Sequence, residues 1–235
     1  MEDDVPKTLA IVGAGPGLGA GVARAFGRRG YRVALIGRTR ATLISLAEKL
    51  AADGIQAEAF PADIHHREAL RSALREAAAA FGPITVLEYG PSPTGEITTA
   101  LGTTVESATQ QFELHMLGAI TAVGEVLPGM LARGDGAVLL TTGVSSTVPA
   151  PFLGNVGPAM AALKNWAGAL ATEVRARGVY VGTLTIATGV VPGSPDGDPD
   201  LIGERYYELA RRRDHFEQTV GDLGDFRALV AQSSR

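Results

Sequence analysis

Short apolar runs alternate with longer amphipathic segments along most of the 235-residue chain. The apolar runs predict six β-strands, at residues 8–12, 32–36, 56–60, 84–89, 136–142 and 179–187. The amphipathic segments predict helices from the first glycine turn to about residue 29 and over residues 41–53, 67–81, 105–132, 157–177 and 200–217. Strict alternation of strands and helices is typical of a parallel, doubly wound sheet with helices on both faces.

We therefore predict a single Rossmann-type α/β domain over residues 1–235, with a sheet of about six to seven strands. The hydrophobic content of 46% is enough for a full core. Residues 192–200 are rich in turn formers and predict a mobile loop. The tail, residues 221–235, carries weak signals and is expected to be partly disordered.

Composition narrows the possible functions. The chain has no cysteine, which excludes disulfides and thiolate metal sites, and no spacing of His, Asp or Glu suggests a metal. The net charge of −4 argues against a nucleic-acid partner. The first residues lack the parts of a signal peptide, and Gly, Pro or charge interrupts every long apolar stretch. We expect a cytoplasmic protein that binds neither nucleic acid nor membrane.

A glycine-rich loop, VGAGPGLG at residues 12–19, follows the first predicted strand and opens a helix. Gly13 permits the tight turn, Gly17 lets the backbone approach a pyrophosphate, and Gly19 allows close helix–strand packing. The helix N-terminus offers free N–H groups and the positive end of a dipole. The loop therefore predicts a dinucleotide site formed by Gly13, Gly15, Pro16, Gly17, Leu18 and Gly19. The alternative is a glycine-rich turn without a ligand.

The second predicted strand ends at Ile36-Gly37-Arg38, where an NAD enzyme would need a carboxylate for the ribose hydroxyls. Arg38 supplies a guanidinium instead, and this group can pair with a 2′-phosphate. We therefore favour NADP(H) over NAD(H) as the cofactor. The alternative is that Arg38 only stacks on adenine or faces solvent.

The spacing Gly13-x-x-x-Gly17-x-Gly19 and the order of elements resemble the short-chain dehydrogenase/reductase family over roughly residues 8–190. Asp63 and Ile64 look like the family's adenine-contacting pair. Tyr89 and Gly90 stand where the family has an NNAG motif, and they are further candidate cofactor contacts. The resemblance implies a lid near residues 190–217, and it implies that the family's closing strand has no counterpart after Glu217.

The resemblance also shows where this chain departs from the family. Members use a Ser-Tyr-Lys set, usually aided by an Asn, to reduce a carbonyl. Aligned on the helix that contains Ala161, these four positions carry Gly143, Val156, Met160 and His115. A frame shifted by one helical turn would place Lys164 as the lysine, but neither frame contains a tyrosine.

Three residues are candidates for the missing chemistry. His115 could pass a proton, and Thr142 or Ser145 could orient a carbonyl at the end of the fifth strand. His115 could equally be a hydrogen-bonded histidine between helices, and the hydroxyls could cap their own loop. Asn155 could contact the nicotinamide ribose or serve only its turn. Of Tyr206 and Tyr207, at most one can face the substrate.

We expect an oxidoreductase that uses a non-standard proton donor on a small-molecule carbonyl or activated double bond. Two alternatives remain open from the sequence. One is an inactive NADP(H)-binding sensor or partner subunit, and the other is a non-redox enzyme, such as a cyclase or isomerase, that reuses the site. The long helix containing His115 and the helix from residue 157 resemble the family's interface helices, so a homodimer or homotetramer is expected.

Overall fold

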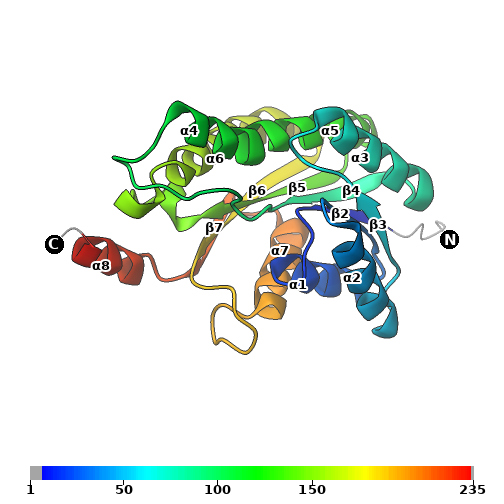
Figure 1. Ribbon diagram of the computed structural model, residues 1–235. Coiled ribbons are helices and arrows are strands. Elements are labelled where there is room, and N and C mark those ends of the chain that lie inside the picture. Colours follow the sequence, from blue (N-terminus) through cyan, green and yellow to red (C-terminus); the bar gives the residue numbers. More distant parts are fainter. Residues whose placement is uncertain (1–6, 234–235) are drawn as a thin grey trace.

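The computed structural model describes residues 7–233 and contains one seven-stranded sheet in the order β3-β2-β1-β4-β5-β6-β7 (Figure 1). Every neighbouring pair of strands is parallel. The strands are β1 Thr8–Val12, β2 Arg32–Gly37, β3 Ala57–Pro61, β4 Ile84–Tyr89, β5 Gly136–Gly143, β6 Val179–Ala187 and β7 Glu217–Gly221. This sheet confirms the predicted fold class.

Helices cover both faces of the sheet. On one face, α3, α5 and α6 bury an apolar layer that continues into β1, β4 and β5. On the other face, α1, α2 and α7 bury a second layer. The helices are α1 Leu18–Gly27, α2 Arg40–Ala52, α3 Arg67–Phe81, α4 Val105–Phe112, α5 Gly118–Arg133, α6 Val156–Val174, α7 Pro199–Arg212 and α8 Leu223–Ser233.

The end of the chain differs from the sequence prediction in two ways. A seventh strand, β7, pairs with β6 from Thr183–Glu217 to Ala187–Gly221. Helix α8 follows it where disorder was expected, and the Phe226 ring packs against Phe152 with their centroids 6.0 Å apart. The strand was missed because its sequence is EQTVG, in which Val220 is the only large apolar residue. An edge strand with so little apolar content has almost no periodic signal.

Helix α7 is not the expected lid, because it packs in the layer beside α1 (Figure 1). It begins at an N-cap, Asp198, whose side chain accepts hydrogen bonds from two backbone N–H groups. Tyr206 is fully buried, and the Tyr207 ring packs edge-on against Phe26 at 5.3 Å. Neither tyrosine is therefore free to cover a substrate. Of the predicted lid, residues 190–198 form a loop beyond the end of β6.

The long helix predicted over residues 105–132 consists of α4, a π-helical turn at Glu113–Leu117, and α5. Taken together, Val105–Arg133 is long and apolar enough to cross a membrane, which the sequence reading had excluded. Half of its most apolar window is buried inside the protein. Burial against the sheet accounts for this apolar content, since the core helix of a globular domain can be equally long and apolar.

The crossing of α1 and α7 leaves no room for a side chain at Gly21. A Cβ there would overlap the Pro199 carbonyl oxygen, and a Cβ at Gly203 would overlap the Gly21 carbonyl oxygen. We predict that Gly21→Ala lowers the free energy of unfolding by about 1–3 kcal/mol, because the two backbones must separate. Denaturant unfolding measures this change.

The control is Gly124→Ala in α5, where an added Cβ would meet nothing within 4 Å. This variant should be as stable as the wild type or more stable, because alanine favours a helix over glycine by up to about 1 kcal/mol. Equal stability of the two variants would show that the α1–α7 crossing is not close-packed.

Candidate functional site

The glycine loop joins β1 to α1 at the carboxyl edge of the sheet. Gly13 has a φ of +93°, and a Cβ there would lie 2.6 Å from Pro91 backbone atoms. An added Cβ at Gly15 or Gly17 would meet nothing within 4 Å, so the space over these two residues is open. Helix α1 begins after Gly17 with neither a side-chain cap nor an acidic residue in its first turn. The loop can therefore present free N–H groups to an anion.

Arg38 lies immediately after β2, beside this loop. Its side chain is exposed and forms no hydrogen bond or ion pair with any described residue. Gly37 precedes it, and the Ala14 carbonyl oxygen approaches the Gly37 Cβ position to 3.2 Å. Arg38 therefore has no side-chain partner among the described residues, and it directly follows a residue that contacts the glycine loop.

The other predicted cofactor contacts occupy different environments. Asp63 is half-buried, and one of its carboxylate oxygens accepts a hydrogen bond from His65 N–H at 3.0 Å. Ile64 is buried in the core. Gly90 N–H donates to the Val12 carbonyl at 3.0 Å, which places it next to the start of the glycine loop.

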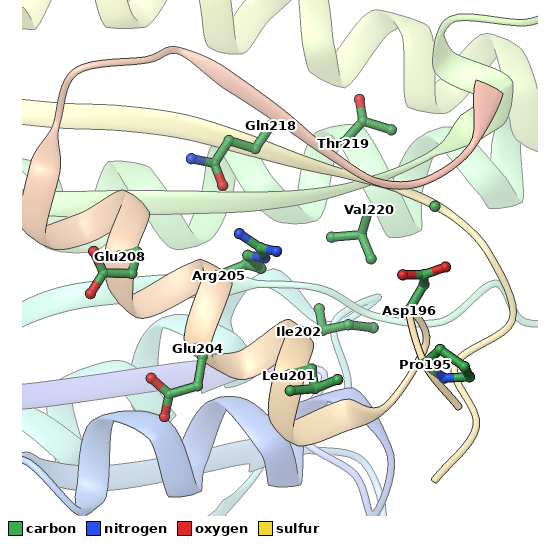
Figure 2. Close-up of a pocket in the computed structure, with 11 residues that line it drawn as sticks. Pro195, Asp196, Leu201, Ile202, Glu204, Arg205, Glu208, Gln218, Thr219 and Val220 are labelled. Carbon is green, nitrogen blue, oxygen red and sulfur yellow. The ribbon is translucent and has the colours of Figure 1, made fainter. Parts of the chain in front are cut away.

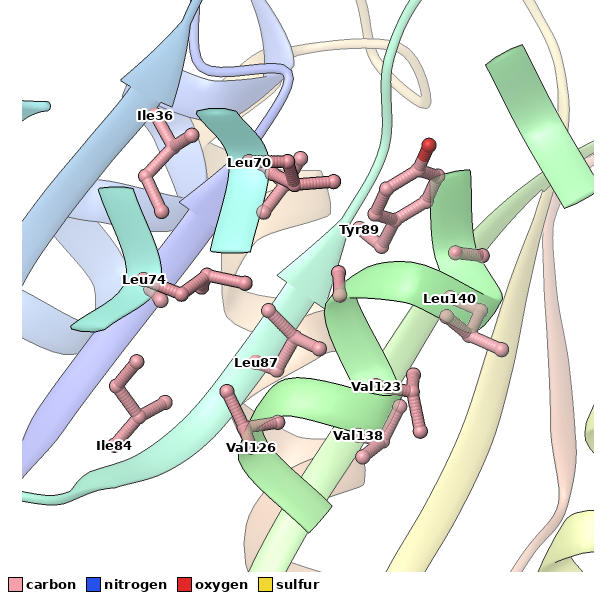
Figure 3. Close-up of a cluster of buried hydrophobic side chains, with 14 of the residues drawn as sticks. Ile36, Leu70, Leu74, Ile84, Leu87, Tyr89, Val123, Val126, Val138 and Leu140 are labelled. Carbon is pink, nitrogen blue, oxygen red and sulfur yellow. The ribbon is translucent and has the colours of Figure 1, made fainter. Parts of the chain in front are cut away.

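Tyr89 is not on the surface of the site, contrary to the sequence prediction. It is fully buried between the sheet and α5 (Figure 3), and its hydroxyl donates to the Leu114 carbonyl in the π-helical turn. Burial raises the pKa of this phenol well above its usual value. A Cβ at Gly118 would overlap the Tyr89 hydroxyl oxygen. Tyr89 therefore holds the turn in place and does not line a ligand site.

His115 lies in the middle of that π-helical turn. Its side chain is 1% exposed, and Nε2 is buried without a hydrogen-bond partner among residues 7–233. Burial lowers the pKa of the imidazole to about 4, so the ring is neutral at pH 7. Single π-turns within helices often mark functional sites, and an unpaired buried nitrogen is costly unless a ligand or water completes it.

The two candidate hydroxyls differ from each other. Thr142 is fully buried and hydrogen-bonds Thr185 on β6 at 2.9 Å. Ser145 is 7% exposed in the 3₁₀ turn that follows β5, and its hydroxyl has no partner among the described residues. Of the two, Ser145 is the more available to a ligand.

A chain of polar groups begins at Thr142. Thr185 also donates to Glu217 at 2.8 Å, and Glu217 pairs with Lys164 at 2.5 Å. Lys164 in turn donates to Thr147 at 2.8 Å. The lysine is therefore held by an ion pair that ties α6 to the edge strand β7.

Asn155 serves the backbone of a neighbouring loop. Its amide donates to the Glu96 carbonyl at 2.8 Å and accepts from Thr98 N–H at 3.0 Å. Both ends of the amide are thus engaged, which favours the turn-chemistry interpretation. The next residue, Val156, and Met160 one turn later are buried on α6, and Gly143 ends β5.

A buried acid that sequence reasoning missed lies on the opposite face of the sheet. Glu88 is 2% exposed, and burial raises the pKa of its carboxyl to about 8. It accepts a hydrogen bond from Thr141 at 2.7 Å, and Thr141 also bonds the Tyr206 hydroxyl at 2.5 Å. The apolar pattern of β4 does not reveal that the Glu88 carboxyl faces the core.

A cavity of about 620 Å³ lies between α7, β7 and the preceding loop (Figure 2). Arg205, Glu204 and Asp196 are among its lining residues. It does not include the glycine loop or His115, so we do not assign it to the same site. Among the described residues, no group of three or more His, Cys, Asp or Glu is arranged to hold a metal.

Residues 7–194 match the family model described as short chain dehydrogenase. This chain belongs to the short-chain dehydrogenase family. The match includes the glycine loop, the π-helical turn and the ends of β4 and β5. The match therefore also includes Arg38, His115 and Ser145.

The curated relatives of this chain include two proteins that are less than 30% identical to it. The glycine betaine reductase ATRR of Emericella nidulans is 28% identical over 197 residues, which cover 84% of this chain. A short chain dehydrogenase of Pseudocercospora fijiensis is 27% identical over 203 residues, or 83% of this chain. The matches span only 15% and 62% of those two proteins.

A solved structure shares the fold at lower identity. It is an NADPH-bound short chain oxidoreductase of Pseudomonas aeruginosa PAO1, described as containing an atypical catalytic center. It is 20% identical with a TM-score of 0.81, and the match covers 91% of this chain and 95% of that one.

The buried acid Glu88 makes the stability of this chain depend on pH. Folded Glu88 keeps its proton up to about pH 8, whereas an unfolded glutamate loses it near its ordinary pKa of 4.5. Stability from this group is therefore full below pH 4.5 and is lost as the pH rises to 8, at about 1.4 kcal/mol per pKa unit. We predict that Glu88→Gln flattens this decline in thermal unfolding between pH 5 and 9.

The exposed strand residue Glu58 supplies a matched control, since Glu58→Gln should leave the decline unchanged. Comparing the slopes against pH separates titration from any constant loss of stability in the Glu88→Gln variant. A Glu88→Gln slope equal to that of the wild type would mean that Glu88 is ionised in the folded protein.

Proposed function

We propose that this chain is an NADP(H)-dependent oxidoreductase that reduces a carbonyl or an activated double bond with a non-standard proton donor. The observation that carries the proposal is the unpartnered Nε2 of His115 in the π-helical turn. By resemblance, that turn carries the relay position of the family. The remaining positions of the standard set carry Gly143, Val156 and Met160, which supply neither acid nor base.

The described residues fit a dinucleotide. The open space over Gly15 and Gly17 and the uncapped start of α1 suit a diphosphate. The unpaired Arg38 suits a 2′-phosphate, which a guanidinium binds in two-point geometry. The NADPH-bound structure of similar fold supports the same choice of cofactor. When bound, the cofactor would supply the hydride.

The chain itself must manage the proton. A developing alkoxide needs a hydrogen-bond donor in a site that excludes water. A neutral imidazole has one N–H and one lone pair. Its N–H can hydrogen-bond the developing alkoxide, or one ring nitrogen can release a proton toward the alkoxide while the other takes up a proton from water. Burial keeps His115 in this neutral form. Ser145, with its free hydroxyl, is the candidate to orient the substrate oxygen.

The neutral imidazole gives the first test. We predict that His115→Ala lowers kcat by about 100-fold or more, the usual effect of a general acid–base group, while NADPH binding is retained. NADPH consumption with a panel of carbonyl compounds measures turnover, and fluorescence titration measures binding. Because the pKa is about 4, the wild-type rate should not respond to this group between pH 6 and 8, and it should fall as His115 charges near pH 4.

His66→Ala, at an exposed histidine before α3, is the matched control and should keep full activity. Unchanged turnover in His115→Ala would remove His115 from the mechanism. Tight NADPH binding with no turnover of any compound would favour the alternative of a binding subunit or sensor.

Cofactor choice is tested separately at Arg38. We predict that Arg38→Asp shifts the ratio of kcat/KM for NADPH over NADH by at least about tenfold toward NADH, since a lost charged hydrogen bond is worth about 1.5–3 kcal/mol. Arg28→Asp, at another exposed arginine beyond α1, should leave the ratio unchanged. An unaltered ratio in Arg38→Asp would exclude a 2′-phosphate at this position.

A further inference from the structure

Exposed apolar side chains gather at the carboxyl edge of the sheet. Nine large apolar residues are exposed in the described part of the chain, and six of them lie within residues 90–105, 188–198 and 222–233, which directly follow the ends of β4, β6 and β7. One of these, Leu101, has its side chain completely open to solvent. We call these six residues the apolar rim: Ile97, Leu101, Val105, Val190, Val191 and Leu229.

Backbone hydrogen bonds join the loop after β4, which carries Ile97 and Leu101, to the turn at residues 151–154. The Gly154 N–H donates to the Thr98 carbonyl at 2.8 Å, and the Ala100 N–H donates to the Pro151 carbonyl at 2.7 Å. The loop that carries Ile97 and Leu101 is thus fixed against the turn that leads into α6, directly after the end of β5.

The other two segments join the same edge. Phe226, one turn before Leu229 on α8, packs against Phe152 in that turn. At the start of the loop that carries Val190, Thr188 lies against Gly221, where β7 ends. Figure 1 shows α8 and the start of α4 on the same side of the molecule, at the carboxyl ends of the strands.

The charge around the rim has one predominant sign. Within residues 92–106, 144–155, 188–198 and 219–232 the sequence contains a single basic residue, Arg227. The same segments contain six acidic residues: Glu96, Glu106, Asp196, Asp198, Asp222 and Asp225. A carboxylate or phosphate on the part of a substrate that reaches the rim would meet repulsion there, since these segments contain six acidic residues and one basic residue.

We propose that the substrate is an uncharged carbonyl compound with a large apolar body, which the rim contacts while the reacting carbon lies at the carboxyl edge. Ligands of open parallel sheets bind at that edge, so a substrate body extending from the site reaches the rim. Exposed apolar groups at such a position gain free energy when a ligand covers them. The inference rests on the proposed reductase function.

The kinetic test compares two substrates of equal length, 2-decanone and 9-oxodecanoate, which differ in a terminal carboxylate. We expect kcat/KM to be at least tenfold higher for 2-decanone. Leu101→Ser and Val191→Ser should each raise its KM about threefold or more without changing kcat, because apolar area is lost. The double variant Glu96→Lys, Asp196→Lys should lower the ratio of kcat/KM for 2-decanone over 9-oxodecanoate by at least threefold.

Matched controls come from outside the rim. Ile44→Ser on α2 and Ile120→Ser on α5 remove exposed apolar side chains elsewhere and should leave KM unchanged. Glu58→Lys reverses an exposed charge on β3 and should leave the substrate preference unchanged. Equal kcat/KM for the two substrates, or equal effects of rim and control variants, would overturn the proposal.

A binding measurement separates this inference from the proposed function. The protein loaded with NADPH should bind uncharged Nile red more tightly than anionic 1-anilinonaphthalene-8-sulfonate, and the rim variants should weaken Nile red binding about threefold. If neither ketone is reduced, the wider panel of carbonyl compounds decides the reductase function, and this binding result decides the rim. Light scattering completes the test, because rim variants that convert an oligomer to monomers would identify the rim as a subunit interface and overturn the proposal.

Discussion

The arrangement of the site depends on one backbone contact between the ends of β1 and β4. Gly13 turns there with a positive φ, and its Cα is so close to Pro91 that no side chain fits between them. The chain leaves β1 toward one face of the sheet and β4 toward the other. Where two neighbouring strands diverge in this way, the edge of a parallel sheet opens to a ligand. The glycine loop, Arg38 and the π-helical turn are all positioned around this divergence.

The sequence was sufficient for most of the sheet. β1, β4, β6 and α3 have the bounds that their apolar patterns predicted, because each is buried along its length or on one clear face. β7 could not be predicted, since its contribution is backbone pairing and one ion pair instead of apolar burial. The prediction that α7 belongs to a lid was wrong for a related reason. The amphipathic pattern of α7 shows that one face is apolar, but it does not show which surface that face covers.

The candidate site was predictable to a similar degree. The glycine loop and Arg38 follow from local spacing, and the structure gives both the open surroundings that a ligand needs. Tyr89 and Glu88 could not be assigned correctly, since adjacent strand residues point to opposite faces and both faces of this sheet are buried. The isolation of His115 Nε2 was also hidden, because it depends on the π-helical turn and on the packing around it.

The phenol of Tyr89 fills the space that a side chain at Gly118 would need. The hydroxyl oxygen stands where any side chain at residue 118 would begin, and it also provides a partner for the Leu114 carbonyl. A side chain at residue 118 therefore requires a smaller residue at position 89. In homologues that keep this turn, a side chain at position 118 should occur together with a smaller residue at position 89. Another hydrogen-bond donor should then serve the carbonyl of residue 114. Positions 89 and 118 should therefore covary, although one ends β4 and the other begins α5.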